Sequence, residues 1–182
     1  MIILALIAGI VLYVISIYNK LVKNRQMVEE GWSGIDVQLK RRSNLIPNLV
    51  EAVKGYMKHE KGLLEEITSL RARAEAAEDA DAATRAKAES ALSAGLIKLN
   101  AVMENYPDLK ANQNVLDLQN SLEDVENEIQ MSRRYYNGAV RNNNVLVESF
   151  PSNLVAKQFA FDVGEYFEIE NEADTAVPKV EL

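Results

Sequence analysis

Few clusters in this chain have the residue types and spacing that enzyme or metal chemistry requires. His59, the only histidine, is followed by Glu60 and opens like the HExxH zinc-protease motif, but Leu63 stands where the second histidine belongs. The sequence contains no cysteine, no Glu-x-x-His pair of the di-iron type, and no glycine-rich phosphate loop. We therefore expect no catalytic residue, no cofactor and no metal, and hence no enzyme.

The remaining charge clusters are of two kinds. Carboxylates at Glu65-Glu66 and between Glu123 and Glu128 are expected to be solvated helix faces. The run Lys40-Arg41-Arg42 is the best candidate for a recognition surface. It serves either the carbonyl end of a helix, where cations are favoured, or a contact with a protein partner or another copy of the chain. The formal charge of −7 and the pI near 4.9 argue against nucleic acid.

Two apolar helical faces meet at this basic run. Val28, Trp32, Ile35 and Leu39 recur at helical spacing before it, and a second apolar face begins at Ile46. Pro47 suits the first turn of a new helix, so the pattern predicts a helical hairpin that turns near residues 40–44. The alternative is one long helix kinked at Pro47. Two glycines, Gly31 and Gly34, flank Trp32. Either they allow a neighbouring helix to approach closely or the helix simply tolerates them.

Residues 1–18 are uncharged apart from the terminal amine and predict a transmembrane anchor. As a helix they rise about 27 Å, near the thickness of the hydrocarbon layer. Tyr13 and Tyr18 are candidate interface residues, and Lys20, Lys23 and Arg25 follow the apolar run. That order favours an N-terminus outside and the bulk of the chain in the cytoplasm. The alternative, a cleaved signal peptide, lacks a basic first region and a small-residue cleavage site.

Residues 19–150 predict an up-down four-helix bundle with long helices, which makes the chain all-α. A second helix is expected to end near Glu78, with Asp81 capping the third. Pro107 ends the third helix, and Asn112 or Asn114 opens the fourth. The fourth helix carries a near-heptad stripe typical of coiled coils, formed by Val115, Leu118, Leu122, Val125, Ile129, Ser132, Tyr136, Val140 and Leu146. Asn143 falls on this stripe, either as a buried register-fixing residue or at a point where the helix loosens.

A short aromatic segment, residues 151–167, follows the bundle. Four alternating passes return the chain to the membrane end, so Phe150, Phe159 and Phe161 are candidate membrane-interface residues. The alternative is that these rings plug the end of the bundle. Residues 168–182 are acidic with little apolar content and predict a disordered tail.

Several motifs in this sequence resemble the signature of the LemA family of bacterial membrane proteins. They are DVQLKRR (36–42), LIPNLV (45–50), VKGY (53–56), HE (59–60), YN (18–19), YPDLKA (106–111), YN (136–137) and FP (150–151). The resemblance runs from the first apolar residues to about Phe167. It implies a helical bundle on an N-terminal anchor in the bacterial inner membrane, and it brings no catalytic residues. Some related proteins take part in building magnetosome membranes.

These observations lead to a non-catalytic, membrane-anchored helical scaffold that self-associates and contacts lipid, organising or remodelling the membrane. The alternative is an accessory module that docks a membrane enzyme or protease. A bundle enzyme is a distant third possibility. The first two differ in stoichiometry, because a scaffold forms homo-oligomers whereas an adaptor awaits a protein partner.

Overall fold

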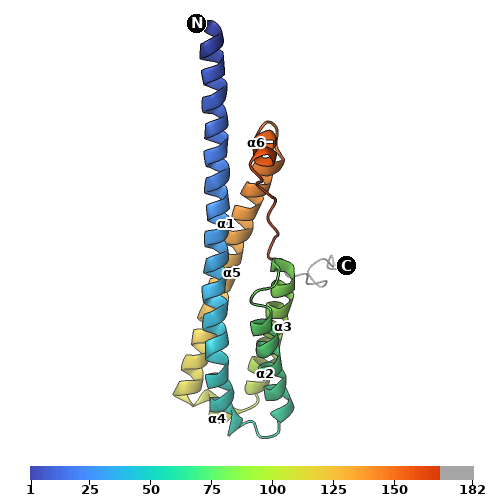
Figure 1. Ribbon diagram of the computed structural model, residues 1–182. Coiled ribbons are helices and arrows are strands. Elements are labelled where there is room, and N and C mark those ends of the chain that lie inside the picture. The colour runs from blue at the N-terminus through green and yellow to red at the C-terminus, as the bar shows by residue number, and fades with distance from the viewer. Residues whose placement is uncertain (169–182) are drawn as a thin grey trace, which may run out of the picture. The chain divides into compact units, whose positions relative to one another are not determined.

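The structure is a computed structural model that describes residues 1–168. Within that range the regular elements are all helices, which confirms the predicted all-α class (Figure 1). They are α1 (Ile2–Lys54), α2 (Lys61–Ala76), α3 (Ala82–Met103), α4 (Pro107–Lys110), α5 (Gln113–Glu148) and α6 (Ser152–Gln158). The predicted tail lies outside the described residues, except for Glu168.

The described residues form two compact units. Unit 1 contains Met1–Gln38 and Asn127–Tyr166, and unit 2 contains Leu39–Glu126 with Phe167 and Glu168. Two helices, α1 and α5, therefore contribute residues to both units, whereas α2, α3 and α4 belong to unit 2 and α6 belongs to unit 1.

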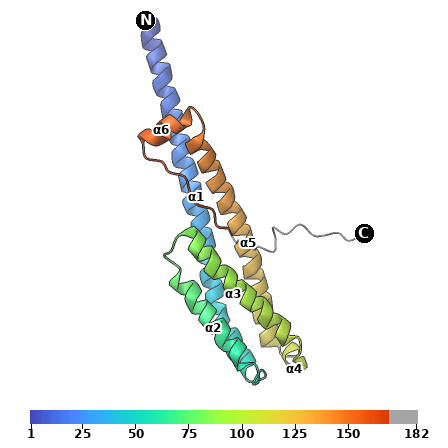
Figure 2. The ribbon, with the colours of Figure 1, turned by 90° about the vertical axis from the view of Figure 1, so that its right-hand side faces the viewer.

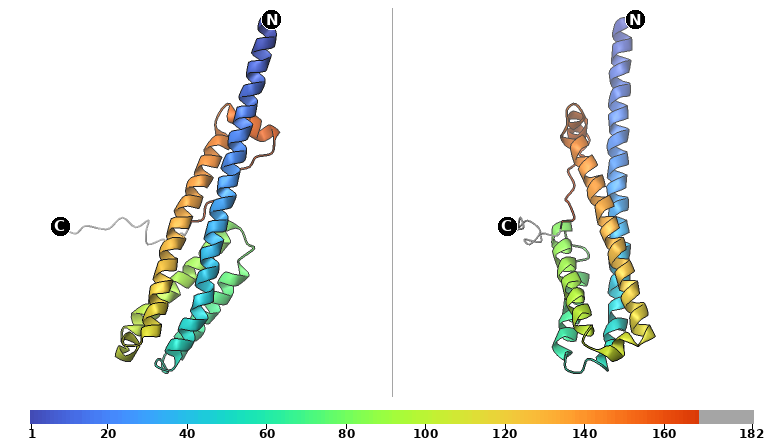
Figure 3. Two further views of the ribbon diagram at one scale, coloured as in Figure 1. Left: turned by 90° about the vertical axis from the view of Figure 1, so that its left-hand side faces the viewer. Right: turned by 180° about the vertical axis from the view of Figure 1, so that it is seen from behind.

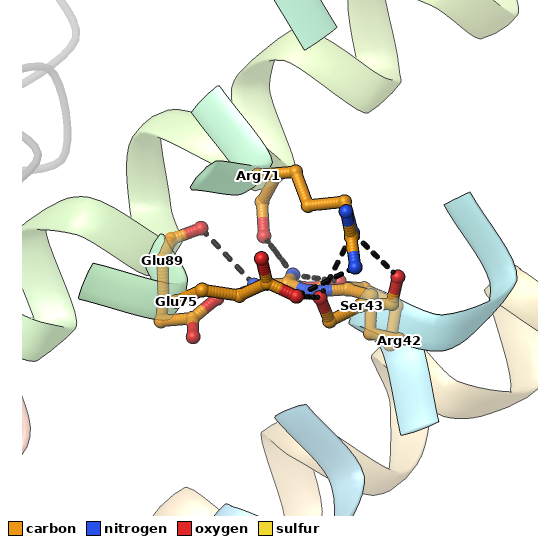
Figure 4. A network of polar contacts seen from close by, with 7 residues as sticks. Arg42, Ser43, Arg71, Glu75 and Glu89 are labelled. Atoms are coloured by element: carbon orange, nitrogen blue, oxygen red, sulfur yellow. Dashed lines mark hydrogen bonds and ion pairs between the residues drawn. The ribbon is translucent and has the colours of Figure 1, made fainter. Parts of the chain in front are cut away.

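The predicted hairpin at residues 40–44 is wrong, because α1 continues without a break to Lys54 and the chain turns at residues 55–60. Pro47 lies inside this helix, where it has no N–H to donate to the carbonyl of Ser43 four residues earlier. Arg71 of α2 replaces that donor: its Nε lies 2.9 Å from the Ser43 carbonyl oxygen and 3.1 Å from Ser43 Oγ (Figure 4). A side chain from another helix thus satisfies the carbonyl that proline leaves without its helical partner.

The later helix boundaries follow the predicted capping residues. The side chain of Asp81 accepts a hydrogen bond of 2.8 Å from the backbone N–H of Thr84 at the start of α3. This bond, together with one from the Thr84 hydroxyl, holds the pKa of the Asp81 carboxyl below its usual value. Asn112 Oδ1 accepts a bond of 3.0 Å from the N–H of Asn114 as α5 begins. Both caps satisfy N–H groups that have no partner within the helix.

Unit 2 is built around one apolar core. Its buried members come from α1, α2, α3, α4, α5 and the turn before α2, and they include Ile46, Leu49, Met57, Ile67, Leu92, Leu99, Leu109 and Val115. Within the unit, α2 and α3 pack side by side (Figure 2). Gly95 permits this packing, since a Cβ at that position would lie 2.7 Å from Leu70 Cδ1. Leu118 and Leu122 of the predicted stripe lie against the same core.

Unit 1 pairs the first part of α1 with the last part of α5. A Cβ built at Gly31 would lie only 3.0 Å from the Cα of Tyr136, so this glycine does allow close approach of the α5 backbone. At Gly34 the nearest atom, Ser132 Oγ, is 3.9 Å away, an ordinary contact. The Trp32 ring packs on Tyr136 with centroids 5.4 Å apart. The two glycines therefore differ: Gly31 is required by packing, and Gly34 is tolerated.

Candidate functional site

The first residues of α1 carry apolar side chains that pack against no other segment. Every residue from Met1 to Tyr13 is exposed. Among the helices of the described residues, α1 is the one that is long and apolar enough to cross a membrane. In the ribbon the N-terminal part of α1 extends beyond the other segments of unit 1 (Figure 1). Exposed apolar side chains in such number are typical of a surface that lies in lipid.

The aromatic segment lies against the end of this apolar stretch. Ile17 and Leu21 of α1 form a small core with Val155, Ala156 and Phe161, so α6 lies beside this part of α1 (Figure 3). The Tyr18 ring makes edge contacts with Phe159 at 4.9 Å and with Phe161 at 5.7 Å between centroids.

The candidate interface residues divide between the inside and the outside of unit 1. Phe161 is buried, and its ring lies under the Arg25 guanidinium at 5.3 Å, so it fills the core. The prediction that Phe161 faces lipid is therefore wrong. Tyr18 is partly covered by its two aromatic contacts, whereas Tyr13, Phe150 and Phe159 are exposed by 56%, 79% and 51%.

The segment after α6 is fastened to α5 by side-chain hydrogen bonds. Asn144 accepts from the N–H of Gly164 at 2.8 Å and donates to its carbonyl at 2.9 Å. Asn143 donates to the carbonyl of Asp162 at 3.1 Å, and the Tyr136 hydroxyl donates to the carbonyl of Glu165 at 2.9 Å. Burial, followed by the charge of Glu165, raises the pKa of Tyr136.

Asn143 is buried within an intact helix. Of the two predicted alternatives, a buried residue on the stripe or a loosened helix, the structure shows the first. Its amide and that of Asn144 provide the donors and acceptors that an irregular chain needs when it packs on a helix. The polar run near the end of α5 therefore holds the segment that follows α6.

The basic run of residues 40–42 lies in the interior of α1 and not in its last turn, which rules out its predicted role at a helix terminus. Arg42 is buried, and its guanidinium lies between two carboxylates of unit 2. It pairs with Glu89 of α3 (Figure 4). It also pairs with Glu126 of α5 at 2.6 Å and donates a hydrogen bond to Ser93. Since an unpaired buried charge is costly, this set of partners explains how an arginine fits inside unit 2.

Lys40 and Arg41, by contrast, are exposed on α1. They keep the predicted status of candidate partner or assembly contacts, while Arg42 serves the interior. His59 is exposed in the turn before α2, and residues 1–168 contain no group of three or more potential metal-binding side chains.

Sequence reasoning missed the partners of Arg42. One signal was available: Glu89 falls three residues after Ala86 and three before Leu92, on the buried side of α3. A carboxylate on an apolar face predicts a buried cation. The role of Arg71 had no comparable signal, because it depends on which residue lies beside Ser43 in space.

Comparisons with known proteins agree with the sequence motifs. The sequence model that describes the LemA family matches residues 31–182. A curated relative, Protein LemA from Metamycoplasma hominis, is 27% identical over 140 residues, which cover 77% of this chain and 64% of that protein. The chain thus spans less than two thirds of the length of that relative. Because the family match extends over well more than half of the sequence, the chain belongs to the LemA family.

Proposed function

We propose that this protein is a membrane-anchored helical scaffold of the bacterial inner membrane, with its N-terminus outside and the rest in the cytoplasm. The observation that carries the anchor is the exposed apolar stretch from Met1 to Tyr13, followed by Lys20, Lys23 and Arg25. Ile17 is a member of the core that holds α6. Cleavage after the apolar run would remove it, which favours a permanent anchor over a signal peptide.

The orientation is tested with a reporter that is active only in the periplasm. Fused after Leu182 it is expected to be silent, and fused before Met1 it is expected to be active. Activity at Leu182 would reverse the orientation while leaving the anchor itself in place.

We further propose that α1, α2, α3 and α5 form an up-down four-helix bundle in unit 2, and that this bundle works by association and not by catalysis. The shared core of these helices supports the arrangement. The exposed pair Lys40 and Arg41 is the proposed contact between copies.

The mass of the full chain purified in detergent tests self-association. A homo-oligomer is expected, and Lys40→Glu with Arg41→Glu is expected to reduce its size without lowering the melting temperature. The matched control is Lys58→Glu with Lys87→Glu, two other exposed cations of unit 2 with the same change of charge. A strictly monomeric wild type would refute the scaffold.

An accessory role that docks one client is the second candidate, and a groove in unit 2 favours it. The groove has a volume of about 350 Å³ and runs between α3 and α5. Apolar side chains, among them Leu99, Met103 and Leu122, line it beside the carboxylates of Glu123 and Glu126. A monomer that gains mass only in the presence of a membrane protein would support this candidate.

A further inference from the structure

We propose that α6 and the residues on either side of it rest in the headgroup layer of the bilayer that α1 spans, as a second membrane contact. The inference rests on the proposed anchor. It names lipid as the partner of the exposed apolar side chains of this segment, called here the interfacial patch: Phe150, Leu154, Phe159 and Val163.

The first argument is position along α1. The residues of α1 that hold α6, Ile17 and Leu21, lie on either side of Lys20, the first charged side chain of the chain. A transmembrane helix leaves the hydrocarbon layer where its charges begin. Since Tyr18 also contacts the Phe159 ring, α6 lies at the level where the anchor meets the headgroups.

The second argument is that α6 has two faces. Val155 and Ala156 are buried against α1, while Leu154 is 61% exposed on the other side. The flanking Phe150 and Phe159 are also exposed, as is Val163 at 53%. A short helix that is packed on one face, exposes a leucine and is flanked by exposed aromatic rings has the two-sided character of a segment that lies in a membrane interface.

The third argument is that the structure holds this patch in place. Asn143 and Asn144 fix the backbone of residues 162 and 164 to α5. The turn after α6 is closed by a bond of 2.9 Å from the N–H of Phe161 to the carbonyl of Ala156, with Ala160 at φ 53°. The exposure of Phe159 therefore belongs to a fastened turn and not to a loose end.

Charge is compatible with a lipid occupant. Within residues 19–25 and 148–165, the parts of unit 1 next to the patch in the chain, the exposed cations are Lys20, Lys23, Arg25 and Lys157, and the exposed acids are Glu148, Asp162 and Glu165. The cations outnumber the acids, so repulsion by anionic lipid does not dominate. Lys157 lies on α6 itself, where its ammonium can reach lipid phosphates while its stem lies along the apolar surface.

Site-specific fluorescence in vesicles tests the proposal. The chain contains no cysteine, so a single introduced cysteine carries the only label. Full-length protein labelled at Leu154 is reconstituted into vesicles of phosphatidylcholine and phosphatidylglycerol that carry quenchers at shallow or deep positions. Met131, another exposed apolar residue of unit 1, provides the matched control, and Leu6 in the anchor reports the span.

We expect shallow quenchers to act on the Leu154 label several times more strongly than on the Met131 label. Phe150→Ser with Phe159→Ser is expected to remove that difference without changing the helix content. Equal quenching at Leu154 and Met131, with Leu6 still quenched, would overturn the second contact and leave the anchor intact. Energy transfer between Leu154 labels without lipid quenching would assign the patch to another copy, which also overturns it. Absence of quenching at Leu6 would instead refute the anchor.

Discussion

The hydrogen bond from Arg71 to the Ser43 carbonyl predicts that substitutions of Pro47 and Arg71, which lie on different helices, are coupled in their effect on stability. In an ordinary helix interior, proline costs about 3 kcal/mol relative to alanine. Here Arg71 donates a hydrogen bond to the Ser43 carbonyl, which Pro47 leaves without its helical partner. Pro47→Ala should therefore raise the free energy of unfolding less in the wild type than in the Arg71→Met variant. In the Pro47→Ala background the regained N–H bonds to Ser43, and the arginine is no longer needed there.

The expected coupling follows from the contacts of Arg71. A hydrogen bond from a charged donor contributes about 1.5–3 kcal/mol, and the partial exposure of Arg71, 26% of its side chain, places this one at the lower end. Its ion pair with Glu75, also partly exposed, is present in both backgrounds and cancels. We therefore expect the two substitutions to be coupled by about 1.5 kcal/mol.

Chemical unfolding of the full chain in detergent, followed by circular dichroism, measures the four free energies. Asn48→Ala provides the matched control, because it alters the exposed residue next to Pro47 on the same helix without restoring an N–H. It should show no coupling to Arg71→Met. If the coupling between Pro47→Ala and Arg71→Met is also below about 0.3 kcal/mol, the role assigned to Arg71 is refuted.

Three further predictions concern other contacts. Arg42→Met should destabilise unit 2 by about 3–5 kcal/mol by leaving a buried carboxylate without its cation, and adding Glu89→Met should recover part of that loss in the same unfolding assay. Gly31→Ala should lower the melting temperature, since overpacking costs about 1–3 kcal/mol, whereas Gly34→Ala should raise it through helix propensity; a shift of the same sign in both would contradict the packing described. The pKa of Asp81 is lowered by folding, so its contribution is present above the ordinary aspartate pKa and is lost as pH falls through the lowered value; the stability difference between wild type and Asp81→Ala should therefore shrink in acid.

Local signals in the sequence predicted the helices and several of their ends. Asp81 and Asn112 cap the helices they were expected to cap, because a capping side chain acts within three residues of its own position. Helical spacing placed Asn143 on the apolar stripe but left open whether it is buried or marks a loosened helix; the structure shows that it is buried. The features that depend on residues a few positions away in the sequence, such as helix caps, could therefore be predicted from the sequence.

The turn after the basic run was mispredicted because its cause is distant. Arg42 pairs with Glu89, which is 47 positions away in the sequence, and with Glu126, which is 84 positions away. The Ser43 carbonyl accepts a hydrogen bond from Arg71, which is 28 positions away. These contacts turn a basic, proline-marked segment into the interior of a helix. Helical periodicity carries no information on such pairs, so a pattern typical of a helix end could not be distinguished from a helix stabilised by its neighbours.

The continuity of α1 from Ile2 through Gln38 has a consequence for the rotation of the anchor. In unit 1 no loop separates the apolar stretch from Gly31, whose backbone must face α5. Each helical residue turns the side-chain direction by about 100° about the helix axis. Because the helix is continuous, the packing of Gly31 on α5 also fixes how the anchor is rotated about its own axis. One residue inserted after Asn19 would rotate the anchor by about 100° relative to α5, whereas seven would rotate it by only about 20°. A membrane partner that recognises one side of this helix would therefore bind or fail to bind according to a rotation of the anchor that is set by packing outside the bilayer.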